Sequence, residues 1–149
     1  MAQPRGMQSL FTIVTQGPGL YEFTDEVAAW LADHCSQGEG QSDGLLTLFL
    51  RHTSCSLLVQ ENADAAVQRD LAAFLGRLIP SADAPEMRYL THRQEGPDDM
   101  PAHLKAALLP VSLSIPVAAG RMLLGTWQGL YLWEHRQAPH RRQVAAHFG

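Results

Sequence analysis

The chain has 149 residues, of which 46% are hydrophobic and 17% are charged, and its formal net charge is -4. This length and composition predict one packed globular domain, and the lack of a basic surplus argues against a nucleic-acid partner. No apolar run is long enough to span a bilayer, and the first residues lack the apolar core of a signal peptide. Because two cysteines are too few for a disulfide framework, we expect a cytoplasmic protein without a membrane partner.

The first part of the chain is expected to form a strand and then a helix. We expect residues 1–8 to be a loosely ordered extension, followed by a strand over 9–14 and a turn at the "GPG" of 17–19. Thr24 is predicted to cap a helix, with acidic residues in its first turn, that ends before the "QGEG" of 37–40.

The middle of the chain predicts two strands and a second helix. Residues 44–54 indicate a buried strand, because apolar residues fall on both of its faces, and "SLLVQEN" (56–62) continues as another. Apolar residues at helical spacing then run from Val67 to Leu78, and Pro80 ends that helix.

The last third predicts one more helix and a run of hairpin strands. The helix is expected to open at Asp98 or Asp99 and to run until Pro110, with Pro101 in its first turn. The "VSLSIPVAAG" of 111–120 alternates between apolar and polar residues and ends in a hairpin turn signal. Three further stretches have strand composition: "RMLLGTW", "GLYLWEHR" and "RRQVAAHF".

The order of these elements decides the fold class. Helices come early and in the middle, and hairpin strands follow, which favours an α+β fold over repeated βαβ units. We therefore expect a mixed, largely antiparallel sheet packed with about three helices, in a single domain over residues 1–149. Pro116 lies inside a predicted strand and therefore indicates a sheet edge or a bulge.

Seven histidines raise the question of a metal site, although the sequence contains no local metal-binding motif. His52 ends an apolar strand, and His92 ends a short extended stretch. His103 lies about one turn into the third helix, four residues after Asp99, so the two can share one helix face. The alternatives are a polar residue where a strand surfaces, for His52, and a solvent-exposed histidine on a capped helix, for His103.

Other polar residues of interest adjoin apolar strands. Glu134 continues the apolar face of its strand, and a carboxylate there is either paired or functional, because an unpaired buried charge is costly. His135 points to the opposite face. In a regular strand His52 and Cys55 also point to opposite faces, which disfavours a cysteine–histidine nucleophile pair.

Four stretches together resemble the YjbQ family over most of the chain, from Ser9 onward: "LRHTSCSLLVQENAD", "HRQEGPDDMPAHLKAALL", "SLSIPVAAGRMLLGTWQGLYLWEHR" and "RRQ". Members of this family are described as secondary thiamine-phosphate synthases. The resemblance implies a small α+β domain that forms a homotrimer, with a site near the subunit contacts. The implied activity joins hydroxymethylpyrimidine diphosphate to thiazole phosphate and releases pyrophosphate.

The resemblance also implies the roles of individual residues. Three histidines match family positions and would hold a divalent metal, zinc or magnesium: His52, His92 and His103. Three polar residues would line the same pocket as catalytic groups, the first as general base or as a partner of a metal ligand: Glu134, Gln128 and Asn62. Four would bind the substrate: Arg51, Ser54, Asp98 and Arg136. Cys55 and His135 depart from the family pattern and receive no role.

Two further functions remain open at this point. One is a metal-dependent hydrolase of a small phosphorylated or cyclic substrate, since histidine ligands and a nearby glutamate would activate a water. The other is a non-catalytic trimeric module that binds a small anionic metabolite. The acidic loop around Asp98 and Asp99 would repel phosphates unless a cation is bound there or the carboxylates point elsewhere.

Overall fold

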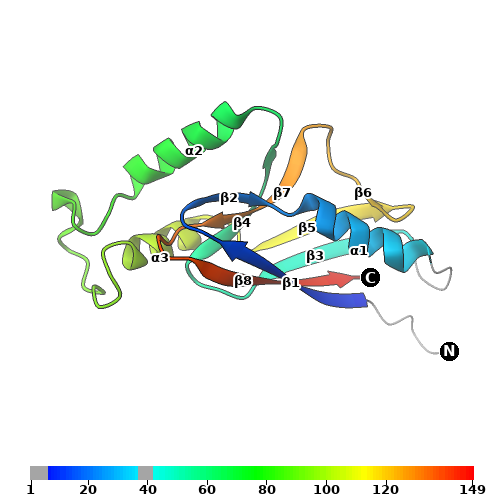
Figure 1. Cartoon of the computed structure of the whole chain (residues 1–149), viewed down its shortest axis with the longest axis horizontal. Coiled ribbons are helices and arrows are strands. Elements are labelled where there is room, and N and C mark those ends of the chain that lie inside the picture. Colours follow the sequence, from blue (N-terminus) through cyan, green and yellow to red (C-terminus); the bar gives the residue numbers. More distant parts are fainter. Residues whose placement is uncertain (1–6, 37–41) are drawn as a thin grey trace.

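A computed structural model describes residues 7–36 and 42–149, which form two antiparallel sheets and three α-helices (Figure 1). The larger sheet has five strands, in the order β1 (Met7–Thr15), β8 (His140–Phe148), β3 (Gly44–Leu50), β5 (Ser112–Ala118) and β6 (Arg121–Met122). The smaller sheet has three strands, in the order β2 (Gly19–Glu22), β7 (Gln128–Glu134) and β4 (Cys55–Glu61). The expected α+β class is confirmed.

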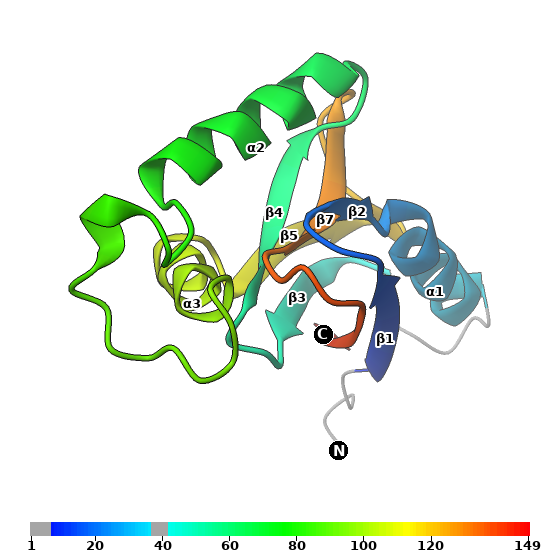
Figure 2. The ribbon, with the colours of Figure 1, turned by 60° about the vertical axis from the view of Figure 1, so that its left-hand side comes forward.

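The helices lie on two sides of these sheets (Figure 2). The helix α2 (Ala65–Leu78) and the helix α3 (Asp99–Leu108) lie on one side, together with the short 3-10 helix Pro85–Met87. The helix α1 (Thr24–Ser36) lies on the other side, at the opposite end of the molecule. No helix in the described part of the chain is both long and apolar enough to span a membrane.

The strand β7 is buried on both faces and separates two apolar cores. Leu130 and Leu132 contribute to the core between the two sheets, together with side chains of β3, β8 and α1. Trp133 faces the other way and packs with Leu75 and Ile79 of α2 in a second core. This double burial explains the almost continuous apolar composition of the strand.

The structure corrects two expectations about the N-terminal part of the chain and adds one strand to it. Met7 and Gln8 belong to β1 rather than to a loose extension, and residues 1–6 lie outside the described part. The short strand β2, between the "GPG" turn and α1, was not predicted, because four residues are too few to show a periodicity. Thr24 is the first residue of α1 and not its cap, since its hydroxyl accepts a hydrogen bond from the Leu130 N–H instead.

The strand β5, which contains Pro116, lies next to the edge strand β6 of the large sheet, as expected. It pairs with β3 along its length and with β6 only over Val117 and Ala118. Pro116 lies just beyond the β6 pairing, where its carbonyl accepts from the Leu123 N–H and no N–H of its own is required. Ala119 and Gly120 both have positive φ, 51° and 74°, and form the expected hairpin turn.

The outward face of the five-stranded sheet is open. We define this outer sheet face by its large exposed apolar side chains, each 44–52% exposed: Leu10, Val14, Leu45 and Phe49. A hollow of about 570 Å³ lies on the same face, over β1, β3 and β8. Apolar area of this kind on one face is typical of a surface that meets another molecule.

Candidate functional site

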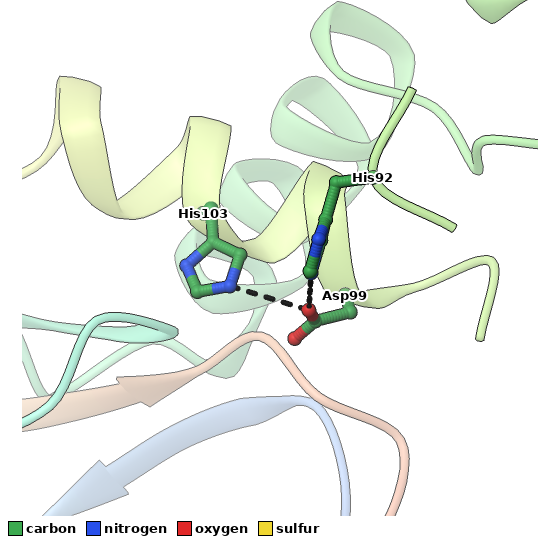
Figure 3. Close-up of side chains that lie close together, drawn as sticks. All are labelled: His92, Asp99 and His103. Atoms are coloured by element: carbon green, nitrogen blue, oxygen red, sulfur yellow. Dashed lines mark hydrogen bonds and ion pairs between the residues drawn. The ribbon is translucent and has the colours of Figure 1, made fainter. Parts of the chain in front are cut away.

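Two histidines converge on one aspartate where α3 begins (Figure 3). Nε2 of His92 lies 2.6 Å from Oδ2 of Asp99, and Nε2 of His103 lies 3.2 Å from the same oxygen. The three ligand atoms all lie within 4.8 Å of one another. We call these residues the His–Asp–His cluster. Asp99 is 1% exposed, whereas the side chain of His92 is 44% exposed, so the cluster can be reached from solvent.

Hydrogen bonding fixes the tautomer of His103. Its Nδ1 lies 2.9 Å from the Thr53 carbonyl oxygen, which can only accept, so Nδ1 carries a proton. In the neutral ring Nε2 then presents a lone pair to the Asp99 carboxylate at 3.2 Å. This nitrogen and this carboxylate oxygen are close enough to act together as ligands of one metal ion. A backbone carbonyl that accepts the other N–H is also what orients metal-binding histidines.

Arg136 holds the opposite side of Asp99. Its Nη1 donates to Oδ1 of Asp99 at 2.7 Å, its Nε donates to Asp98 at 2.9 Å, and its Nη2 donates to the Glu95 carbonyl. Burial acts to raise the pKa of Asp99, but the hydrogen bond from His92 and the charge of Arg136 hold that pKa below its usual value. The carboxylate therefore stays ionised, with Oδ2 turned toward the two imidazoles.

Glu134 supports this arrangement from the end of β7. Its side chain is fully buried and accepts from both Nε and Nη2 of Arg142, at 2.8 and 2.6 Å, and from the Thr15 hydroxyl at 2.7 Å. It also accepts from the backbone N–H groups of His135 and Arg136. Burial acts to raise the pKa of Glu134, but the Arg142 and Thr15 hydrogen bonds lower it overall. Both oxygens are hydrogen-bonded and the side chain is fully buried, so within this chain Glu134 contacts the backbone at Arg136 and does not open to solvent.

The structure places His52 outside the His–Asp–His cluster. Its Nε2 accepts a hydrogen bond of 2.8 Å from the Gln143 N–H, so in the neutral ring the proton lies on Nδ1. Burial, and then the charge of Arg142, lower the pKa of His52, which keeps the ring neutral. With one nitrogen accepting and the other protonated, this ring has no lone pair for a metal. In the His–Asp–His cluster Asp99, and not His52, lies beside His92 and His103.

The predicted substrate-binding residues are not equally available. Ser54 is buried, and its hydroxyl accepts from Arg142, while Asp98 accepts from Arg136 and from the Gln137 N–H. The guanidinium of Arg136 is itself engaged by three acceptors. Arg51 differs, because it is exposed and its guanidinium donates only to the Gln143 side chain among the contacts that the structure describes.

Gln128 and Asn62 do not share a pocket with Glu134 within one chain. Gln128 begins β7 and Glu134 ends it, so the two lie at opposite ends of a seven-residue strand. Asn62 donates to Glu22, and the Gln128 side chain accepts from Gly125. The family pattern gives residue identities but not their positions along the strand, so it did not show this separation within one chain.

Cys55 and His135 are buried and unsuited to nucleophilic chemistry. Burial raises the pKa of the Cys55 thiol to about 12. The His135 ring pairs with the Ser56 hydroxyl at 2.8 Å, and burial lowers its pKa to about 3, so it is neutral at physiological pH.

Comparisons with known proteins cover nearly the whole chain. The family model described as "UPF0047 protein YjbQ-like" matches residues 9–149. The chain belongs to the YjbQ family. Among its relatives in this family, a UPF0047 protein of Synechocystis is 47% identical over 143 residues, 96% of this chain and 91% of the relative.

Another YjbQ family member, the UPF0047 protein YjbQ of Escherichia coli O157:H7, is 40% identical over 139 residues, 93% of this chain and 94% of its own. A crystal structure of a conserved hypothetical protein from Thermus thermophilus is 33% identical and has a TM-score of 0.78. It covers 95% of this chain and 99% of its own. These similarities establish the YjbQ fold, and their names state no reaction.

The buried pair of Glu134 and Arg142 generates a stability prediction. Replacing Arg142 by Leu leaves a buried carboxylate unpaired, which we expect to cost about 3–5 kcal/mol of unfolding free energy at pH 7. Replacing both residues by Leu is expected to recover most of that loss. Urea denaturation of the three proteins measures these values.

The pH dependence of the unfolding free energy should also change sign in Arg142→Leu. In the wild type the lowered pKa of Glu134 gives stability that is present above about pH 4 and is lost on acidification through the folded-state pKa. In Arg142→Leu the carboxyl pKa is raised, so that variant should lose stability as the pH rises. Parallel pH profiles for wild type and variant would contradict the assignment.

Proposed function

We propose that this protein is a divalent-metal-dependent enzyme that acts on small phosphorylated metabolites through the His–Asp–His cluster. The observation that carries the proposal is the pair of facing acceptors, Nε2 of His103 and Oδ2 of Asp99, with Nδ1–H of His103 anchored on a carbonyl. The reaction that we propose is of the thiamine-phosphate-synthase type, joining hydroxymethylpyrimidine diphosphate to thiazole phosphate. That choice of substrates is supported by the family resemblance.

The donor set fits zinc better than magnesium. Two imidazole nitrogens and one carboxylate oxygen suit zinc and similar transition metals, whereas magnesium prefers oxygen ligands alone. A divalent ion at such a site supplies positive charge against phosphate oxygens. Without that charge the carboxylates of Asp98 and Asp99 would repel a phosphorylated substrate.

The chain's own residues have distinct tasks in this proposal. Arg136 orients Asp99, and the Thr53 carbonyl orients His103, so both ligand atoms are positioned before a metal arrives. Arg51 provides the exposed guanidinium for a phosphate group. Glu134 acts as a positioning residue, because it binds the backbone of the loop that carries Arg136.

A metal-dependent hydrolase is the second candidate. The observation in its favour is the donor set of two histidines and one aspartate, because catalytic zinc sites with three protein ligands keep a fourth position for a water. Its substrate would be a small phosphorylated or cyclic compound. A binding module for an anionic metabolite would use the same residues without turnover.

We also propose a homotrimer, with the outer sheet face as the contact surface. The exposed Leu10, Val14, Leu45 and Phe49 support this, because monomers rarely leave such apolar area on one sheet face open. Arg51 and Gln143 lie where β3 and β8 approach the candidate site, so a neighbouring subunit on this face would lie near that site.

The catalytic proposal is tested by complementation of a thiamine auxotroph. Expression of the wild type should restore growth, and Asp99→Asn and His103→Ala should not, because each removes a ligand of the cluster. His34→Ala, a histidine change on α1, is the matched control and should restore growth. Failure of the wild type to rescue would contradict the synthase reaction. Metal-dependent phosphodiester cleavage by the purified protein, lost in Asp99→Asn, would then identify the hydrolase.

The trimer is tested by light scattering coupled to size-exclusion chromatography. The wild type should elute with three times the mass of the chain, and Phe49→Asp together with Leu10→Asp should give a folded monomer. Phe74→Asp, at a more exposed apolar position on α2, should leave the trimer intact. A wild-type mass equal to one chain would refute the assembly.

A further inference from the structure

A surface pocket of about 290 Å³ adjoins the His–Asp–His cluster, between the β3–β4 corner and α3. We propose that this pocket binds a neutral planar ring of the substrate, and that His52 donates a hydrogen bond to an acceptor on that ring. That the ring belongs to a substrate rests on the proposed function. The pocket itself is inferred from its own lining and is tested separately.

The lining of the pocket favours an uncharged ligand. Its apolar part consists of small side chains: Cys55, Ala106, Ala107 and Val111. Because the pKa of Cys55 is raised to about 12, its thiol stays protonated and behaves as an apolar group. No Lys, Arg, Asp or Glu lines the pocket among the residues that the structure describes. A phosphate group would therefore find no counter-charge there.

The size of the pocket limits the ligand to one ring with a substituent. A cavity of roughly 150 Å³ is sufficient for a benzene-sized molecule. The observed volume of about 290 Å³ exceeds this, but it is at the lower end of ordinary ligand pockets. The pocket exists because the α3 residues that line it, Ala106 and Ala107, have small side chains. Larger side chains at these two positions would fill it.

His52 gives the pocket a directional polar group. Its Nε2 is already satisfied by the Gln143 N–H, so the ring nitrogen that remains is a donor and not an acceptor. A ligand that accepts a hydrogen bond in its own ring plane would pair with this donor. This assignment replaces the metal role that the sequence predicted for His52.

His103 joins the pocket to the cluster. It lines the pocket, and its Nε2 faces Asp99 in the cluster. A substrate that places its ring between His52 and α3 would therefore place an attached anionic group next to His103 and Asp99. The two parts of the site would recognise the two ends of one molecule.

The test uses NMR titration of the full, metal-free chain with 4-aminopyrimidine, which has ring acceptors and no phosphate. Saturable amide shifts should gather at Thr53, Ala106, Ala107 and Val111. Ala107→Phe, at an exposed helix position on the pocket, should abolish binding, and the control Ala73→Phe on α2 should not. His52→Ala should weaken binding about five- to tenfold, as expected for one neutral hydrogen bond.

Aniline, which lacks ring nitrogens, should bind more weakly than 4-aminopyrimidine and should be insensitive to His52→Ala. Shifts located elsewhere, no saturable binding, or equal affinity in Ala107→Phe and Ala73→Phe would overturn the proposal. Binding of 4-aminopyrimidine by a protein that takes up no zinc would support the pocket and count against the proposed function. Zinc uptake without 4-aminopyrimidine binding would overturn the pocket proposal and support the metal site of the proposed function.

Discussion

The carboxylate of Glu134 lies where the two sheets and the candidate site meet. It ends β7 of the small sheet and accepts from Thr15 at the end of β1 and from Arg142 of β8, both in the large sheet. The same carboxylate accepts from the backbone of His135 and Arg136, where the chain leaves β7. A single buried side chain thus fixes the packing of two sheets and the path of the loop that carries Arg136.

Arg136 connects the loop held by Glu134 to the candidate site. Its guanidinium is shared by Asp98 and Asp99 at the start of α3, and Asp99 in turn faces His92 and His103. The site is therefore assembled from a loop and the helix terminus that follows it, together with a strand end that lies 37 residues further along the chain. Arg136 donates to Oδ1 of Asp99, whereas Oδ2 is the oxygen that faces the two histidines.

Much of the fold could be predicted from the sequence, because periodicity and turn residues act locally. The alternation of β5, the helical spacing in α2 and the hairpin at Ala119 and Gly120 are all features of neighbouring residues. The strand β2 could not be predicted in this way, because it has four residues and owes its conformation to pairing with β7.

The site was only partly predictable, because roles depend on tertiary contacts. The four-residue spacing of Asp99 and His103 correctly placed them on one helix face, but a helix-capping role for the aspartate was equally consistent with the sequence. His52 resembled a ligand until its contact with the Gln143 backbone was known, and that contact lies 91 residues away in the chain. Sequence patterns identify candidate side chains, whereas hydrogen bonds decide which of their lone pairs remain available.

The most direct test of this account is X-ray absorption spectroscopy of the zinc-loaded chain at the zinc edge. The account predicts one zinc per chain with two imidazole ligands and one carboxylate ligand. One imidazole should be lost in His103→Ala, and none should be lost in His52→Ala. Three imidazole ligands with one lost in His52→Ala, or a chain that retains no stoichiometric zinc, would contradict the account.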